Sequence, residues 1–253
     1  MKTIITLLGI AMFAAGSVGA CEDSLKINKR SDEYKFWQGF DIGVNGYLNS
    51  RYTIGTNVVF DLDGEAIQTP AGYQFFELDY ARSRSFAWNF AQHNFHIYKN
   101  FINFVTGFGI EWNTYALRKN VTLIQDAPSF SAVQENYNFT KNKFRTIFVN
   151  APLLIEFNMP SKDPENCLHV AAGMTFGYNL FQNRLKQEFS VNGDESKRKI
   201  KDDFNINPFR YSLSARVGYG DVSLFVNYAL SEMFKDNRGP KVYPFSAGVG
   251  LSF

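Results

Sequence analysis

Three histidines, His93, His96 and His169, are the only imidazole groups in the 253-residue chain and the first candidates for acid–base chemistry. His93 and His96 differ in parity, so a flat strand would point them to opposite faces. No serine or aspartate stands at a spacing that singles out a catalytic triad with any of the three. We therefore expect a protein that is not an enzyme, and keep catalysis as one alternative.

An acidic cluster of Asp61, Asp63 and Glu65 would offer Ca²⁺ the carboxylate oxygens that this ion prefers. The twelve-residue register of a calcium-binding loop is missing, however, and acidic residues are ordinary on any solvated loop. The two cysteines, Cys21 and Cys167, provide neither a disulfide framework nor a ligand set for zinc. We expect no metal site and no cofactor.

Five charged residues lie within segments that otherwise alternate apolar with small or polar side chains. They are Asp41, Glu111, Glu156, Arg210 and Arg216. A buried charge must be paired or stay hydrated. If the apolar positions face a membrane, these charges face a barrel lumen and predict an ion-pair network across it. The alternative is a charged path for small solutes, which the narrow bore of an eight-stranded barrel would limit.

The elements that would hold these charges are β-strands, because apolar residues recur at every second position. The pattern is clearest at 209–219, where aromatic and aliphatic residues alternate with arginine, serine and glycine. The least regular segment is 84–98, whose apolar phase slips after Phe90, and we interpret this as a β-bulge near Gln92. Eight strands are predicted in all, at 40–48, 84–98, 102–113, 147–157, 168–180, 209–219, 222–231 and 245–253.

The connections between these strands alternate in length. Short turns at 99–100, 159–166 and 220–221 alternate with longer polar loops at 49–83, 118–142, 184–207 and 233–242. Outer-membrane barrels have this construction, with short periplasmic turns and long external loops, and an even strand count puts both termini on the periplasmic side. Two stretches, 52–60 and 75–80, are either strand extensions or a hairpin that would raise the count to ten.

The N-terminus has the features of a secretory signal. Lys2 precedes an apolar run at 4–15 and small residues at 16–20, which predicts cleavage near Ala20. The run of about twelve residues is shorter than the roughly 20 that a transmembrane helix needs. We expect a signal peptide at 1–20, a short periplasmic segment at 21–36 and a barrel at 37–253. Whether Cys21 is lipidated stays open.

A soluble periplasmic calyx of the lipocalin type is also an eight-stranded barrel, but its apolar face points inward. Aromatic residues make up 17% of the chain although its mean hydropathy is only −0.22. Aromatic rings favour the level where a membrane meets water. We therefore expect a membrane barrel with an aromatic girdle of Trp112, Tyr115, Tyr178, Tyr211, Tyr219, Tyr228 and Phe253.

Charge elsewhere indicates little about partners. The net charge of +2 is too balanced to predict binding to nucleic acid. A basic run at 197–201, followed by Asp202 and Asp203, is typical of a solvated loop. The alternative for this run is contact with lipopolysaccharide phosphates outside the cell.

Several segments resemble the outer-membrane β-barrel proteins of the Bacteroidetes, the PorT-like group. They are 150–157, 173–178, 215–220, 224–228, Gly239-Pro240, 243–246 and the terminal Phe253. The resemblance implies a Gram-negative outer membrane and a terminal aromatic residue read by the barrel-assembly machinery. PorT is linked to a secretion system, but no residue of this chain indicates that it shares this role.

The sequence thus predicts an all-β, antiparallel, up-and-down transmembrane barrel of about eight strands in the cell outer membrane. We expect it to be narrow and plugged by side chains, with external loops for surface contact or for envelope or secretion assembly. Its expected partners are membrane lipids, lipopolysaccharide and the barrel-assembly machinery. The alternatives are a small-solute channel, a barrel enzyme and the soluble calyx.

Overall fold

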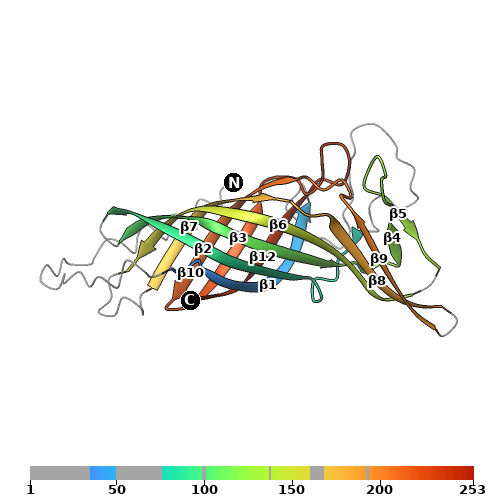
Figure 1. Ribbon diagram of the computed structural model, residues 1–253, viewed down its shortest axis with the longest axis horizontal. Coiled ribbons are helices and arrows are strands. Elements are labelled where there is room, and N and C mark those ends of the chain that lie inside the picture. Colours follow the sequence, from blue (N-terminus) through green and yellow to red (C-terminus); the bar gives the residue numbers. More distant parts are fainter. Residues whose placement is uncertain (1–34, 50–75, 99–100, 137, 160–167, 192–193) are drawn as a thin grey trace, which may run out of the picture. The chain divides into compact units, whose positions relative to one another are not determined.

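The computed structural model describes residues 35–49, 76–98, 101–136, 138–159, 168–191 and 194–253 (Figure 1). The regular elements of these residues are antiparallel β-strands. Among them, no helical segment has the length and apolarity needed to cross a bilayer. The predicted signal peptide and most of the segment 21–36 lie outside the described residues.

Eight strands close into a ring. In order around the ring they are β1 (Gly39–Asn49), β2 (Arg84–Tyr98), β3 (Ile102–Ala116), β6 (Phe139–Asn158), β7 (Leu168–Tyr178), β10 (Phe209–Tyr219), β11 (Val222–Ala229) and β12 (Val242–Ser252). Pairing of β12 with β1 completes the circuit, in the register Gly39 to Ser252 through Asn49 to Val242. The predicted all-β fold with an eight-stranded ring is confirmed.

The ring has two distinct ends. At the turn end, β2 joins β3, β6 joins β7 and β10 joins β11, and the chain terminates there at Phe253. Gly220 in the β10–β11 turn adopts a φ of 54°, which costs glycine little because it lacks a Cβ. The four longer connections all lie at the opposite end, which we call the loop end.

Strand β2 carries the predicted bulge. Its register with β3 shifts between Asn89 and Ala91, so Phe90 is the extra residue, two positions before Gln92. The bulge explains why the apolar pattern of this segment changes phase.

Two segments predicted as loops contain strands, which corrects the sequence-based prediction. Within 118–142 lie the short pair β4 (Val121–Leu123) and β5 (Ala132–Gln134), as well as the beginning of β6. Within 184–207 lies the hairpin of β8 (Asn183–Val191) and β9 (Asp194–Asp202), which pairs with β6 through β8. The hairpin raises the barrel wall beside β6 at the loop end and leaves the ring at eight strands (Figure 1). Stretch 52–60 is outside the described residues, and 76–80 forms only a turn and the Leu78–Leu117 bridge.

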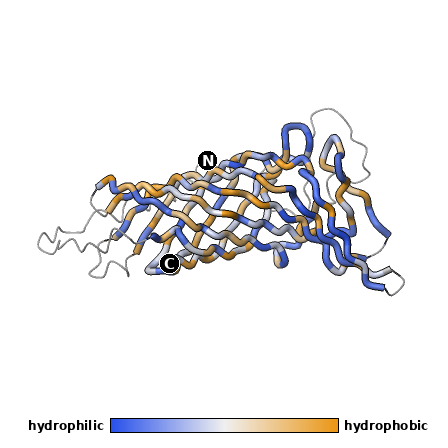
Figure 2. The backbone as a smooth tube through the Cα atoms, in the orientation of Figure 1, coloured by the Kyte–Doolittle hydropathy of each residue, from blue (hydrophilic) through white to orange (hydrophobic). Residues whose placement is uncertain are grey.

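The apolar face of the strands points outward. Residues such as Ile42, Phe108, Leu213 and Leu224 are about half exposed, whereas asparagine, serine and charged residues of the same strands are buried. Figure 2 shows the resulting alternation of hydrophobic and hydrophilic residues along the barrel, with hydrophilic residues gathered on the β8–β9 hairpin. Because a soluble calyx has the opposite arrangement, the lipocalin-like alternative is wrong.

Two apolar clusters lie at the ends of the barrel. The turn-end cluster is Phe36, Trp37, Val105, Leu154 and Ala171. The loop-end cluster joins strand ends to the long connections and comprises Tyr47, Phe76, Leu78, Tyr115, Leu117, Val121, Leu123, Phe130, Phe144, Phe148, Leu185, Phe204, Ile206, Met233, Phe234 and Val242. The loops at this end therefore share a hydrophobic core of their own.

Candidate functional site

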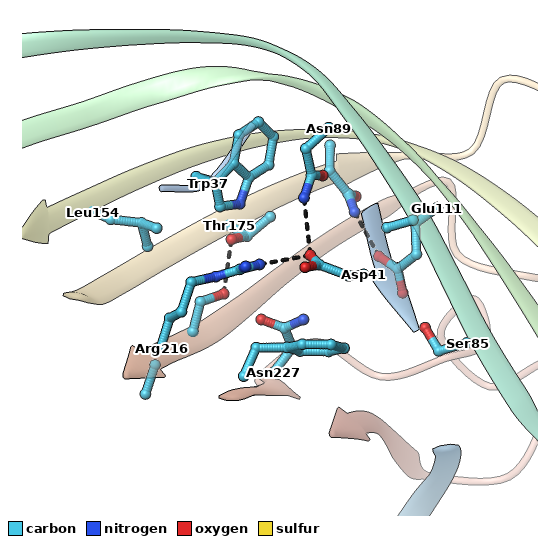
Figure 3. A pocket seen from close by; sticks show the side chains of 14 residues that line it. Trp37, Asp41, Ser85, Asn89, Glu111, Leu154, Thr175, Arg216 and Asn227 are labelled. Atoms are coloured by element: carbon cyan, nitrogen blue, oxygen red, sulfur yellow. Dashed lines mark hydrogen bonds and ion pairs between the residues drawn. The ribbon is translucent and has the colours of Figure 1, made fainter. Parts of the chain in front are cut away.

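An ion pair between Asp41 on β1 and Arg216 on β10 crosses the lumen (Figure 3). Arg216 Nη2 lies 2.6 Å from Asp41 Oδ2, and the two side chains are only 7% and 8% exposed. Asn89 on β2 donates a hydrogen bond of 2.8 Å to the same carboxylate oxygen. Ser223 on β11 accepts one of 2.9 Å from Arg216 Nη1. Four strands of the wall thus hold one buried pair.

A second pair joins Arg210 on β10 to Glu111 on β3, closer to the loop end. Asn113 donates a hydrogen bond of 2.6 Å to Glu111 Oε1, and Asn150 donates another to Oε2. The guanidinium carbon of Arg210 lies 4.2 Å from the ring centroid of Phe148, a cation–π distance. Hydrogen bonding of this completeness is what a buried charge pair requires.

Glu156 has a different environment from the other four predicted lumen charges. It is 1% exposed and accepts a hydrogen bond of 3.2 Å from Asn103 Nδ2. Asn103 Oδ1 is in turn 2.8 Å from Nδ1 of His96. Among the residues that the structure describes, no lysine or arginine lies within ion-pair distance of Glu156. The predicted network is therefore two separate pairs and one carboxyl group in an amide and imidazole cluster.

Gly250 on β12 provides the space for the first pair. A Cβ at this position would collide with the guanidinium of Arg216, the carboxylate of Asp41 and the hydroxyl of Ser223. Small residues in the less apolar face of the strands are thus required where long charged side chains lie against the barrel wall.

The turn end of the lumen is filled by residues that precede β1. Trp37 and Gln38 donate backbone hydrogen bonds of 2.8 and 2.9 Å to the side-chain oxygen of Gln92. Phe36 packs 5.0 Å, ring centroid to ring centroid, from His169, and both residues are fully buried. Phe36, which the sequence assigned to a periplasmic segment, is therefore part of the barrel interior. Two adjacent aromatic residues, Phe36 and Trp37, stand just before the first strand. This pair was the signal in the sequence from which the filling of the turn end was predictable.

Two small cavities lie between these groups. The larger cavity has a volume of about 30 Å³ and is bordered by Trp37, Asp41 and Arg216, among others (Figure 3). A second cavity of about 20 Å³ is bordered by Arg210 and Tyr115. Cavities of this size hold one or two water molecules each.

Comparison with models of protein families matches residues 22–235 to the outer membrane protein beta-barrel domain. The chain belongs to this family. Searches among curated proteins and among solved structures gave no match. Membership places the barrel in the outer membrane, so the exposed apolar face described above is the face toward lipid.

Most of the predicted girdle residues of this outer-membrane barrel lie on its outer face. Tyr178, Tyr211, Tyr219 and Phe253 are 40–66% exposed, and Trp112 and Tyr228 are half-buried. Tyr115 does not belong to the girdle, because it is 1% exposed within the loop-end cluster. It shares its parity with the lumen residues Glu111 and Asn113 of the same strand, so the alternation itself points it inward.

The remaining candidates for chemistry are dispersed over the outer-membrane barrel. His93 packs edge-on against Phe95 on the outer face of β2, whereas His96 contacts Asn103 and His169 is buried. The part of the chain that the structure describes contains no group of three or more histidine, cysteine or acidic residues able to hold a metal ion. The acidic cluster 61–65 and both cysteines lie outside the described residues.

Proposed function

We propose that this outer-membrane barrel is a closed, non-catalytic barrel whose interior is plugged by its own side chains and whose loop end provides a contact surface outside the cell. The observation that carries the proposal is the buried pair Asp41–Arg216, reinforced by the second pair Glu111–Arg210. Each pair joins strands that are three places apart around the ring of eight, so each spans the lumen.

Packing at both ends supports the same proposal. Phe36 and Trp37 occupy the turn end, and the loop-end cluster covers the other. An aqueous channel needs a continuous wet path, whereas the cavities between these clusters have volumes of about 30 and 20 Å³. The small-solute channel is therefore the weaker candidate.

Conductance across a planar lipid bilayer tests the proposal. The purified barrel is expected to insert without producing steady ion-conducting steps at moderate voltage. A Trp37→Ala and Arg216→Ala double variant removes one large side chain from each of two levels of the plug and is expected to conduct in brief openings. Steady conductance by the unaltered protein would contradict the plugged barrel and favour the channel.

The loop end is proposed to serve surface contact or envelope assembly, because its connections share an apolar core of sixteen residues and so present a preformed surface. The segments 150–157 and 215–220 support a more specific placement, in the PorT-like group of a Gram-negative member of the Bacteroidetes. A role in secretion would appear as loss of secreted proteins from a deletion strain that keeps normal membrane permeability.

Export and assembly complete the proposal. A signal peptide cleaved near Ala20 would be detected by sequencing the N-terminus of the mature protein. The terminal strand presents Val249, Leu251 and Phe253 outward, each 42–66% exposed, and Phe253 follows the last paired residue. We propose that this strand is read by the barrel-assembly machinery, and deletion of Phe253 is expected to lower the amount of assembled barrel.

A further inference from the structure

Three cross-strand rows of charged residues cover the outer side of the sheet β6–β8–β9 at the loop end. From the barrel outward the rows are Arg145–Arg184–Lys201, Lys143–Lys186–Lys199 and Lys141–Glu188–Lys197. Directly paired residues share a face of a sheet, so eight cations and one acid lie on one side. We call these nine residues the basic face. Glu195 follows on the same side, nearer the tip of the hairpin.

The basic face continues the lipid-facing side of the barrel. On β6 the exposed residues Phe157, Ile155 and Leu153 have the same parity as Arg145 and Lys143. About twelve residues separate Phe157 from Arg145, or roughly 40 Å along a strand. With a strand tilt of about 40°, the rise along the barrel axis is about 30 Å, just beyond an apolar band about 25 Å tall. The first basic row therefore lies at the level of lipid headgroups.

Aromatic residues mark the same boundary on the neighbouring strands. Tyr178 ends β7 and Phe209 begins β10, both on the outer face, with ring centroids 4.7 Å apart. Tyr178 pairs with Val149 of β6, and the first basic row begins at Arg145, further along β6 toward the loop end. Because aromatic side chains favour the level where a membrane meets water, the cations just beyond this aromatic pair lie close to the headgroups.

The opposite side of this sheet is fixed to the loop-end cluster. Phe144 and Leu185 are fully buried there, and Gln187 donates a hydrogen bond of 2.9 Å to the carbonyl of Val121. Arg198 pairs with Glu135 at 3.0 Å on this inner side. The cations of the basic face consequently project from a sheet whose position is already fixed by packing.

Most of these cations lack a counterion among the described residues. Lys141 pairs with Glu188 at 2.7 Å, and no other member of the basic face has a described acidic residue within ion-pair distance. Nε of Arg184 is buried without a hydrogen-bond partner. The positive charges of Arg184 and Lys201 lower the pKa of Lys199. An external anion would relieve this repulsion.

We propose that the basic face binds the phosphate groups of the glycolipid that surrounds the barrel in the outer leaflet. Several cations at headgroup level, in phase with the lipid-facing side chains, match phosphates that are presented by neighbouring lipid molecules. Arginine and lysine are the side chains that bind phosphate through charge-assisted hydrogen bonds. The inference extends the proposed function and depends on the barrel being in the outer membrane, not on its lumen being closed.

The test measures binding of fluorescent lipid A, with and without its phosphates, to the full-length barrel in phosphatidylcholine nanodiscs. The double variant K186Q/K199Q removes two central cations. Each cation near an anionic lipid surface adds to the free energy of binding. Loss of two cations is therefore expected to weaken the binding of phosphorylated lipid A about 10- to 30-fold. The control K119Q/K241Q changes the net charge equally, at exposed lysines outside the basic face, and is expected to stay within about twofold of the unaltered protein.

Three results would overturn the proposal. Equal weakening by both double variants would indicate a general charge effect, and equal binding of dephosphorylated lipid A would exclude phosphate as the ligand. Competition by inorganic phosphate at the concentration of the lipid would indicate a site for free anions. Faster migration of unboiled samples on gels shows that each variant is folded. Ion conductance through the lumen does not affect lipid A binding at the basic face. The conductance measurement therefore tests the plugged-barrel proposal independently of this one.

Discussion

Asp41 and Arg216 lie on strands β1 and β10, far apart in sequence, and meet in a space that Gly250 leaves open. The period of two predicted that both face the lumen, because parity is a local property of a strand. Their pairing with each other depends on the closure of the ring and on the stagger of its strands. The surroundings of Glu156 were likewise not predictable. Its neighbours Asn103 and His96 are uncharged or weakly basic, so no pattern of charges in the sequence indicates that they contact it.

Removal of one partner tests the first pair. Asp41→Asn leaves Arg216 as an uncompensated buried cation and is expected to destabilise the barrel by about 3–5 kcal/mol. The measurement is the temperature at which the fast-migrating folded band disappears from gels. The double variant Asp41→Asn/Arg216→Met removes both charges and should recover more than half of the loss. A single variant as stable as the unaltered barrel would show that the pair contributes little.

Glu77 allows a prediction about pH at the loop end. A hydrogen bond from Arg118 at 2.8 Å, together with Lys119 at 3.4 Å, holds the pKa of this carboxyl group below its usual value of 4.5. A lowered pKa in the folded state means that the stabilisation is present above about pH 4.5 and is lost as the pH falls through the folded value. Because both cations are largely exposed, the effect is about 1 kcal/mol or less.

Limited proteolysis with an acid-active protease measures this effect on the loop end. Cleavage near Glu77 is expected to accelerate as the pH is lowered from 5 to 3, and Glu77→Gln should be cleaved at a rate that varies little over this interval. An equally steep acceleration for Glu77→Gln would assign the pH dependence to other groups.

The sequence predicted the strands that cross the membrane. It did not predict β8 and β9, which lie beyond the membrane at the loop end. In the membrane one face is uniformly apolar, so the alternation is visible in any single strand. In β8 and β9 the outer positions are charged, and the inner ones, such as Leu185, pack against Phe144 and other distant parts of the chain. A charged segment with few apolar residues looks like a solvated loop until its packing partners are known. The predicted position of the bulge in β2 was close to the observed one, because the bulge produces a local change in the phase of the apolar pattern.

Leu185→Ala tests whether the β8–β9 hairpin depends on the loop-end cluster. Leu185 is fully buried, so the cavity created is expected to cost about 2–5 kcal/mol. Proteases should then cleave the hairpin faster, while heat-modifiable migration of the barrel is retained. Leu213→Ala, at a lipid-facing position that is 49% exposed, is the control and should leave cleavage unchanged. Loss of the fast-migrating band in Leu185→Ala would mean that the ring and the cluster form one cooperative unit.

For the whole molecule, the outward apolar face and the closed ring make a direct prediction. An unboiled sample in detergent should migrate faster than a boiled one, because the hydrogen-bonded ring resists unfolding until it is heated. The family match and the exposed apolar face agree on the membrane setting. The sequence predicted this setting from three features together: the alternation, the connection lengths and the density of aromatic residues. The core that joins the loops was not, since its members come from segments with no repeating pattern.

Among the described residues, the β8–β9 hairpin extends the wall of the ring beside β6, and no described strand extends β12 or β1 in this way (Figure 1). A protein diffusing in the plane of the membrane therefore meets two different flanks. One flank is extended and cationic, and the other presents uncharged, largely apolar side chains of strands such as β12 to the bilayer. With lipid phosphates bound to the basic face as proposed, glycolipid should be held most tightly along β6 and β9, and neighbouring proteins should approach the barrel mainly from the side of β12.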